Sequence, residues 1–424
     1  MPMPIVIIAI AEWFGTALWF TPNAVIDDLQ QLWQLSPGDL GWLTGAVQFG
    51  FLLGTLSLGL SGLADRTRAS RLFALACLIG ALSNALLPYA NGLGSAVGLR
   101  VVTGMSLAGI YPIGMKLMVG WAPGRTGLGL AWLVGMLVLG TAMPHLLSGI
   151  GWSGGGLVDQ SGGGLVDQSG GELVDQSGRG RAGDSDDWRL TLWIASLLSL
   201  VAGMAVWRLG DAPSGPRTSA TTSSRLAGLG AFRIADFRRA AGAYFGHMWE
   251  LYTLWTLIPL LLIAVDPTIS SRTLAMTSFA LIAIGAPGCW FGGWMSQHIG
   301  SRRVAAAGLA GSALCCLSYP WLAPHIGYAT LVGFLGLWSL LAVIDSPQFS
   351  ALSANACPAT LVGSALTLQN AIGFAISAAS IALLVPALPT WEATIAWWLL
   401  PGPLLGLVGL KRIGKPSRVA QSCA

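Results

Sequence analysis

Three ionisable side chains lie inside long apolar stretches of the sequence, where each one requires an explanation. Glu12 lies within the stretch 5–25, and His247 and Glu250 lie within 241–264. The last two are three residues apart, so a helix places them on one face. Histidine titrates near neutral pH and a buried carboxyl can do the same, which makes all three candidates for binding and releasing a proton. A structural pair of His247 and Glu250 that does not titrate is an equal alternative.

Glu12 also begins a polar series on the first apolar stretch. Thr16, Trp19 and Asn23 follow it at steps of four, three and four residues. On one continuous helix over 5–25 these side chains form a single stripe. We therefore expect this face to point away from the apolar surroundings.

Arg100 enters the stretch 95–118 near its beginning. Its guanidinium could pair with an anionic substrate or extend to the surface. The helical rise separates it from Glu12 by about 10 Å in depth, so we expect no resting salt bridge between them.

The remaining polar candidates offer hydrogen bonds. Gln48, Gln369 and Asn370 lie in apolar stretches, and Asp345 and Gln348 lie near the end of 327–348, where they could gate a passage or cap a helix. The six cysteines form no CxxC pair and no metal-like spacing with the four histidines. GxSxG, HExxH and Walker-type motifs are also missing, so the sequence predicts no enzyme, no metal site and no cofactor.

The elements that must position these residues are membrane-spanning helices. Hydrophobic residues make up 54% of the 424 residues and charged residues only 9%, whereas about a quarter are charged in a soluble domain. Apolar runs long enough to cross a hydrocarbon core of ~30 Å recur along the chain. We predict an all-α membrane protein with twelve helices at 5–25, 40–60, 71–90, 95–118, 126–147, 189–207, 241–264, 273–295, 304–322, 327–348, 362–385 and 391–410.

The basic residues predict the orientation of these helices. An even number of spans puts both termini on one side, and Arg and Lys gather in the connections that share that side, among them Arg66, Arg208 and Lys411. The positive-inside rule makes that side cytoplasmic. The formal charge of +4 is thus an orientation signal, and no nucleic-acid partner is expected.

The connections divide the chain into two halves. We predict an N-terminal six-helix bundle over 1–207, a cytoplasmic connector over 208–240, a C-terminal six-helix bundle over 241–414 and a cytoplasmic tail over 415–424. A Gly-rich outer loop at 148–188 carries the successive units GGGLVDQS, GGGLVDQS and GGELVDQS. A tolerated tandem duplication and a recognition role both remain open for that loop.

The two halves show internal similarity. Trp249 and Trp255 repeat the spacing of Trp13 and Trp19. Tyr111-Pro112 and Ser346-Pro347 stand near the ends of corresponding helices. Such a repeat is typical of transporters built from duplicated bundles.

The stretch GLADRTRASR, between the second and third predicted helices, resembles the loop motif of the major facilitator superfamily. The resemblance covers essentially the whole chain and implies a 12-helix permease with two pseudo-symmetric bundles. In that family the motif's acid and basic residues contact helix ends of the other half and bias inward- and outward-open states. The resemblance carries this conformational lock onto Asp65, Arg66, Arg71, Arg302 and Arg303; simple cytoplasmic anchoring is the alternative.

The resemblance also implies a function. It implies a monomeric secondary transporter of the plasma (inner) membrane that moves a small solute by alternating access, driven by protons and without a cofactor. Helices 1, 4 and 7 line the cavity in this family, and Arg100 matches a helix-4 arginine linked there to proton transfer. The candidate cavity residues are Trp13, Thr16, Trp19, Asn23, Gln48, Tyr111, Tyr244, Trp249, Tyr252, Gln369 and Asn370.

Alternatives remain open. A non-transporting receptor with a transporter fold is one of them. Within transporters, a drug or metabolite efflux antiporter competes with an organic-anion uptake symporter. Gly135, Gly140 and Pro144 match the family's exporter motif poorly, which disfavours drug efflux. A channel suits the two-half repeat less well than a carrier does.

Overall fold

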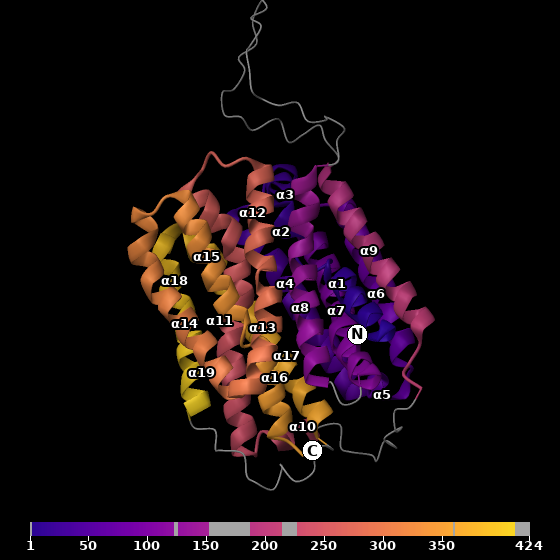
Figure 1. The fold of residues 1–424 in the computed structure, drawn as a ribbon. Coiled ribbons are helices and arrows are strands. Elements are labelled where there is room, and N and C mark those ends of the chain that lie inside the picture. The colour runs from indigo at the N-terminus through magenta and orange to yellow at the C-terminus, as the bar shows by residue number, and fades with distance from the viewer. Residues whose placement is uncertain (1, 123–125, 152–186, 214–226, 359–360, 412–424) are drawn as a thin grey trace, which may run out of the picture.

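The computed structural model describes residues 2–122, 126–151, 187–213, 227–358 and 361–411. Every regular element in these ranges is helical, so the predicted all-α class is confirmed. The predicted repeat loop 154–177, the middle of the connector and the tail 415–424 lie outside the described residues. Helices of the N-terminal half gather on one side of the bundle and most helices of the C-terminal half on the other (Figure 1).

The helices of the N-terminal half run from α1 to α9. Their bounds are α1 Met3–Thr16, α2 Thr21–Ala24, α3 Ile26–Trp33, α4 Pro37–Ser61, α5 Leu63–Arg66, α6 Ala69–Ala85, η1 Leu87–Tyr89, α7 Leu93–Trp121, α8 Thr126–Ile150 and α9 Asp187–Leu209.

The helices of the C-terminal half follow the connector. Their bounds are α10 Ala227–Ala231, α11 Ala235–Val265, α12 Ser271–Ala283, α13 Gly285–Ile299, α14 Ser301–Leu322, η2 Ala323–His325, α15 Tyr328–Val343, α16 Ser346–Asn355, α17 Val362–Trp391, η3 Glu392–Thr394, α18 Ile395–Leu399 and α19 Pro401–Lys411. The helix α11 begins at Ala235, inside the range that the sequence assigned to the connector.

Ten segments of the described chain are long and apolar enough to cross a membrane. The difference from twelve arises at the two ends of the chain. The first predicted span is interrupted, which leaves α1 at 14 residues, and the last two predicted spans form one helical segment over 362–411. All twelve predicted spans are therefore helical over most of their length.

Prolines account for three interruptions of the spans. A proline has no N–H for the carbonyl four residues earlier, which leaves that oxygen without its helical partner. Pro22 follows the break between α1 and α2, Pro287 the break between α12 and α13, and Pro347 the break between α15 and α16. At the last break the freed carbonyl of Val343 lies 3.7 Å from Cys289 Sγ, which donates to it.

The first of these breaks overturns one expectation. Residues 17–20 form turns between α1 and α2, so the helix does not continue through 5–25. Thr16 bonds the carbonyl of Glu12 at 2.7 Å within α1, but Trp19 and Asn23 lie beyond the helix. The predicted continuous stripe of Glu12, Thr16, Trp19 and Asn23 is wrong, because the helical register is lost at the break.

Close backbone packing joins α4 to α7 within the N-terminal half. A Cβ at Gly50 would collide with the carbonyl of Val101, and a Cβ at Gly104 would collide with the carbonyl of Val47. Small residues permit such close approach of membrane helices. The two helices therefore form a rigid unit of that half.

The halves meet along two pairs of spans: α4 with α17, and α8 with the interrupted span that α12 and α13 form. A Cβ at Gly38 would lie 3.5 Å from Pro386 at one end of the first pair, and a Cβ at Gly59 would lie 2.9 Å from Thr367 at the other. In the second pair the rings of Trp132 and Trp290 stack at 4.5 Å. The halves are thus in contact toward both ends of the bundle.

The short helices mark these two ends. The helices α5 and α10 lie at one end and α3 lies at the opposite end (Figure 1). Asp211 caps the start of α6 near α5, where its Oδ1 accepts the N–H of Ser70 at 2.8 Å. We refer below to the α3 end and the α5 end; which of them faces the cytoplasm stays a prediction.

Candidate functional site

A small cavity lies between the two halves. Its volume of about 20 Å³ is close to that of one water molecule, so the halves are closed around it. Apolar side chains form most of its wall, among them Val134 of α8 and Leu251 of α11. The polar lining consists of Tyr111, Tyr244, Tyr252, Ser346, Ser350 and Asn370. Four candidate residues, Tyr111, Tyr244, Tyr252 and Asn370, therefore meet here, while their contact with a solute stays a prediction.

Aromatic rings from both halves close the cavity toward the α3 end. Phe51 of α4 and Phe374 of α17 have ring centroids 4.0 Å apart. Trp19, in the break after α1, stacks on Phe51 at 5.4 Å, on Tyr252 at 5.5 Å and on Phe374 at 5.6 Å. Tyr252 and Phe374 also line the cavity. The contact is therefore a barrier built jointly by the two halves.

Glu250 lies behind the cavity wall, inside the C-terminal half. Its Oε1 accepts hydrogen bonds from Trp338 Nε1 at 2.7 Å and from the hydroxyl of Ser312, and Cys316 Sγ lies 3.4 Å away. The carboxyl is almost fully buried. A buried carboxyl with several donors is stabilised well enough to persist in an apolar bundle.

His247 has a different partner. Its Nδ1 lies 2.9 Å from Oδ1 of Asp345, and both side chains are 1% exposed. Asp345 occupies the break between α15 and α16 and precedes Ser346, which lines the cavity. His247 and Glu250 share a face of α11 but do not bond to each other. The alternative of a structural pair of these two residues is therefore wrong.

Glu12 is buried without a hydrogen-bond partner for either carboxyl oxygen among the described residues. Gly114 of α7 leaves room for it, because a Cβ there would collide with its Oε2. An ionised carboxylate without partners costs several kcal/mol inside a protein. Glu12 is thus a third buried carboxyl, in addition to Glu250 and Asp345.

Arg100 is 1% exposed, which excludes the interpretation that it extends to the surface. Its guanidinium donates to the carbonyl of Leu18 at 3.0 Å and to the carbonyl of Trp19. It also approaches Thr21 Oγ1 at 3.3 Å and Asn84 Oδ1 at 3.5 Å. Arg100 therefore binds the interrupted end of α1 and does not line the cavity.

The other predicted cavity residues lie outside the cavity wall. Asn23 and Thr44 bond each other at 2.9 Å, and Trp249 Nε1 donates to the carbonyl of Trp398 at 2.8 Å. Trp13 packs on Phe14. Gln48 and Gln369 are buried with no hydrogen-bond partner for either amide atom among the described residues. Gln348 is buried, and its Nε2 likewise has none.

The predicted lock residues lie near the α5 end. Arg66, Arg71, Arg302 and Arg303 are exposed. Arg302 donates to the carbonyl of Lys411 at 3.1 Å, within the same half. Asp65 belongs to α5, and Lys116 of α7 donates to the carbonyl of Ala64 beside it. The lock role stays a prediction for all five residues.

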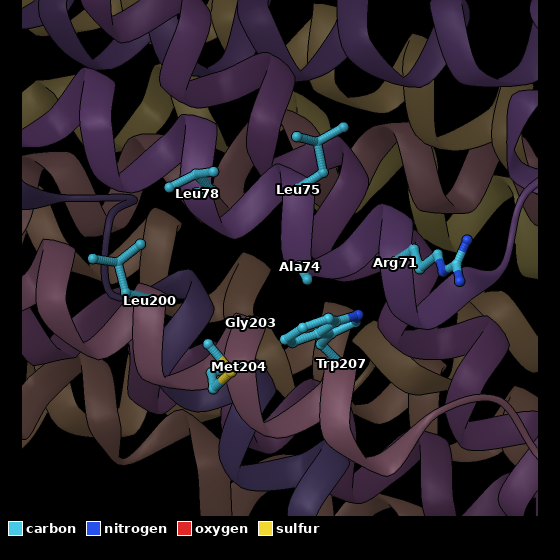
Figure 2. Close-up of a pocket in the computed structure, with 8 residues that line it drawn as sticks. All are labelled: Arg71, Ala74, Leu75, Leu78, Leu200, Gly203, Met204 and Trp207. Carbon is cyan, nitrogen blue, oxygen red and sulfur yellow. The ribbon is translucent and has the colours of Figure 1, made fainter.

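A second hollow lies on the outside of the N-terminal half, between α6 and α9. Leu75, Leu78, Leu200, Met204 and Trp207 line this groove of about 420 Å³, and Arg71 stands at one end of it (Figure 2). It contains none of the buried candidate residues. The groove is therefore separate from the central cavity.

Several residues of the site escaped the sequence analysis. Ser312, Trp338 and Cys316 surround Glu250, and Phe51 and Phe374 form the barrier. A serine, a cysteine and aromatic rings in apolar helices carry no sequence signal of their own. Only their convergence in space reveals the role.

The comparisons with known proteins agree with this architecture. The family model of the Major Facilitator Superfamily matches residues 5–382. The niacin transporter NiaP of Acinetobacter baylyi is 24% identical over 330 residues, which cover 75% of this chain and 70% of NiaP. The inner membrane metabolite transport protein YgcS of Escherichia coli is 28% identical over 121 residues, 27% of each chain.

A solved structure shows the same fold. FucP, a fucose:proton symporter of Escherichia coli, was crystallised in the outward conformation and matches with a TM-score of 0.67 at 14% identity. The match covers 98% of this chain and 99% of FucP. At this identity the likeness concerns the fold alone.

Proposed function

The chain belongs to the Major Facilitator Superfamily, and from this premise we propose that it is a proton-coupled carrier that moves a small solute through the central cavity by alternating access. The cavity between the halves supports this proposal, because a barrier of rings from both halves separates it from the α3 end. A rocking motion of one half against the other would part these rings and widen the cavity.

The cavity wall favours an uncharged solute with a flat apolar body. Among the described residues that line it there is no Asp, Glu, Lys, Arg or His. Tyrosine rings supply stacking surfaces, and the hydroxyls of Tyr111 and Ser350 with the amide of Asn370 supply hydrogen bonds. Since NiaP is named a niacin transporter, small aromatic heterocycles with one polar substituent are the first solutes to test.

Proton coupling is assigned to the buried carboxyls. Glu250 lies behind the cavity wall, and Asp345, which lies 2.9 Å from His247, adjoins the lining residue Ser346. Glu12 is the corresponding candidate in the N-terminal half. Arg100 is left out of the relay, because its donors are occupied by carbonyls of Leu18 and Trp19.

We place the protein in the plasma (inner) membrane as a monomer, with the α5 end cytoplasmic. The Arg-rich connections at this end support the orientation. Sided labelling of single cysteines placed in 154–177 and in 208–240 tests it. Labelling of both from the same side contradicts the twelve-span topology.

Counterflow in liposomes tests the proposed function. Liposomes that contain the purified protein are loaded with an unlabelled solute, and entry of the same solute in labelled form is measured. Nicotinamide, nicotinate and fucose are tested separately. A carrier accumulates the label transiently without an ion gradient, driven only by the exit of the unlabelled solute. Saturable binding without counterflow of any probe supports the receptor alternative instead.

The same liposomes separate the two transport classes. We expect the uncharged amide to exceed the carboxylate in counterflow, because the wall offers no cation. Preference for the carboxylate contradicts the proposed solute chemistry. It then favours the organic-anion symporter.

A further inference from the structure

The interruption of α1 leaves carbonyl oxygens without helical donors. The helix ends at Thr16 and the chain resumes helical form at Thr21. Pro22 has no N–H to give to the carbonyl of Leu18, four residues earlier. Deep inside a membrane protein, water is not at hand to replace such a bond. Thr21 Oγ1 donates to the carbonyl of Leu18 at 3.3 Å, but no group among the described residues of the break donates to the carbonyl of Trp19, so that carbonyl requires a donor from another helix.

Arg100 of α7 supplies that donor. One terminal nitrogen bonds the carbonyl of Leu18 at 3.0 Å and the other bonds the carbonyl of Trp19. The planar fork of a guanidinium fits two adjacent acceptors, whereas a lysine ammonium is a single point donor. A cation at the carbonyl end of a helix is also favoured by the helix dipole.

A polar network holds the guanidinium in place. Asn84 of α6 presents its Oδ1 to Thr21 Oγ1 at 2.6 Å and to Arg100 at 3.5 Å. Its amide nitrogen is itself fixed by the carbonyl of Leu192 at 3.0 Å and by Ser196 Oγ at 3.1 Å. In the described part of the chain no carboxylate pairs with Arg100. The charge is thus balanced by the carbonyls of the break, the hydroxyl of Thr21 and the amide of Asn84.

The residue whose carbonyl Arg100 binds is also the centre of the aromatic barrier. The Trp19 ring is fully buried and stacks on Tyr252 and Phe374 of the other half. These two rings lie nearer the α3 end of their helices than the lining residues Tyr244 and Asn370, by about 12 Å and 6 Å of helical rise. Trp19 therefore packs against the cavity wall at the level of Tyr252 and Phe374, on the side of Tyr244 and Asn370 that faces the α3 end.

We propose that Arg100 is a positioning residue that holds the interrupted end of α1 so that the Trp19 ring closes the cavity toward the α3 end. The inference rests on the proposed carrier function and adds a role for Arg100 other than proton transfer or anion binding. Its bonds lie within the N-terminal half, so they persist when the halves separate. Arg100 fixes the position of the Trp19 ring, on which Tyr252 and Phe374 stack when the halves come together.

Sided labelling of a reporter in the cavity tests the proposal. Ser350→Cys places the reporter on the cavity wall, with Cys357 and Cys423 replaced by serine, and a membrane-impermeant maleimide is added from one side of oriented liposomes. Arg100→Lys keeps the charge but loses one of the two carbonyl bonds. In this variant we expect the rate at which the reporter cysteine is labelled from the α3 end to rise at least about fivefold. The rate of labelling from the α5 end should not rise. The exposed Arg233→Lys serves as the matched control and leaves labelling unchanged.

Two further variants separate positioning from general damage. Trp19→Ala with Arg100 intact should raise labelling as much as Arg100→Lys, and the double variant should add little, because both changes act on one barrier. Pro22→Ala restores an N–H opposite the carbonyl of Leu18. In the Arg100→Gln background it should return labelling toward the parent value, which a folding defect at Arg100 would not allow.

The outcomes divide clearly. Unchanged labelling in Arg100→Lys overturns the proposal, and so does a rise that is equal from both ends or fully additive with Trp19→Ala. Labelling needs neither solute nor gradient, so it stands apart from counterflow. If counterflow fails in the parent protein while Arg100→Lys still opens the α3 end, the carrier function is wrong and the role of Arg100 stands.

Discussion

Trp338 Nε1 donates a hydrogen bond of 2.7 Å to Oε1 of Glu250. The hydroxyl of Ser312 donates to the same oxygen, and Cys316 Sγ lies 3.4 Å from it. With its donors gathered on Oε1, a proton taken up by Glu250 would be carried by Oε2. The carboxyl can therefore change its charge without losing its anchor to α14 and α15.

Glu250→Gln should abolish coupling while keeping the fold. The amide oxygen can still accept from Trp338, but the side chain cannot take up a proton. We expect transport driven by a pH gradient to fall at least about tenfold, equal to about 1.4 kcal/mol, while counterflow of the solute persists. Gradient-driven uptake and counterflow measured in the same liposomes check this. Exposed Glu392→Gln is the control, and an unchanged gradient response in Glu250→Gln removes the residue from the relay.

His247→Ala should destabilise the C-terminal half, because it leaves the carboxyl of Asp345 buried without the imidazole that lies 2.9 Å from it. Leaving a buried polar group without its partner costs about 1–3 kcal/mol. The double variant His247→Ala with Asp345→Asn should recover part of the loss, since the carboxyl that lost its partner is gone. Thermal unfolding in detergent measures both, with the exposed His325→Ala as control. Equal losses in the single and double variants would show that the pair is not coupled.

Gly50→Ala should be strongly destabilising, because the added methyl collides with the carbonyl of Val101 in α7. Overpacking of this kind costs about 1–3 kcal/mol or more when backbone must move. Gly98→Ala provides a matched control in α7, since a Cβ there meets nothing within 4 Å. The melting temperatures of the two variants, compared in detergent, test this prediction. Equal melting temperatures would contradict the close packing of α4 on α7.

Asp28→Asn should change the pH dependence of stability. Burial raises the pKa of Asp28, in the amphipathic α3 outside the spans, to about 6, and the charges of Asp27 and Asp187 add to this shift. Because the folded-state pKa lies above the ordinary value of 3.8, the folded protein binds more protons in the window from about pH 4 to pH 6. Stability is then greatest at the acid side of this window and falls as the pH rises through 6.

Asparagine removes the cost of the buried charge. We expect the variant to be more stable than the parent by about 1 kcal/mol at pH 7.5, after allowance for solvent screening, and equal to it near pH 4. Melting curves at pH 4.5, 6 and 7.5 measure the difference. A constant difference across these values would mean that the carboxyl does not titrate in this window.

The sequence by itself determined the membrane class and the positions of the spans. Uninterrupted apolar runs have no stable alternative to crossing lipid as helices, so length and hydropathy suffice. The sequence also identified Glu12, Arg100, His247 and Glu250 as buried groups that need partners. It did not identify those partners, because contacts between distant helices depend on how each helix is rotated and tilted.

The prolines also show what sequence and tertiary structure each determine. Pro22 and Pro347 follow breaks, whereas Pro112, Pro144 and Pro259 lie inside continuous helices. Each proline removes one hydrogen bond, but whether the helix opens depends on whether neighbouring helices offer a donor to the freed carbonyl.

Only the tertiary structure decided that Arg100 meets the carbonyls of Leu18 and Trp19, and that His247 takes Asp345 and not Glu250 as its partner. The physical reason is that a buried polar group must satisfy its hydrogen bonds locally, and packing alone selects which groups are near. The sequence thus shows which buried groups need a partner, and the packing of the helices determines which residue that partner is.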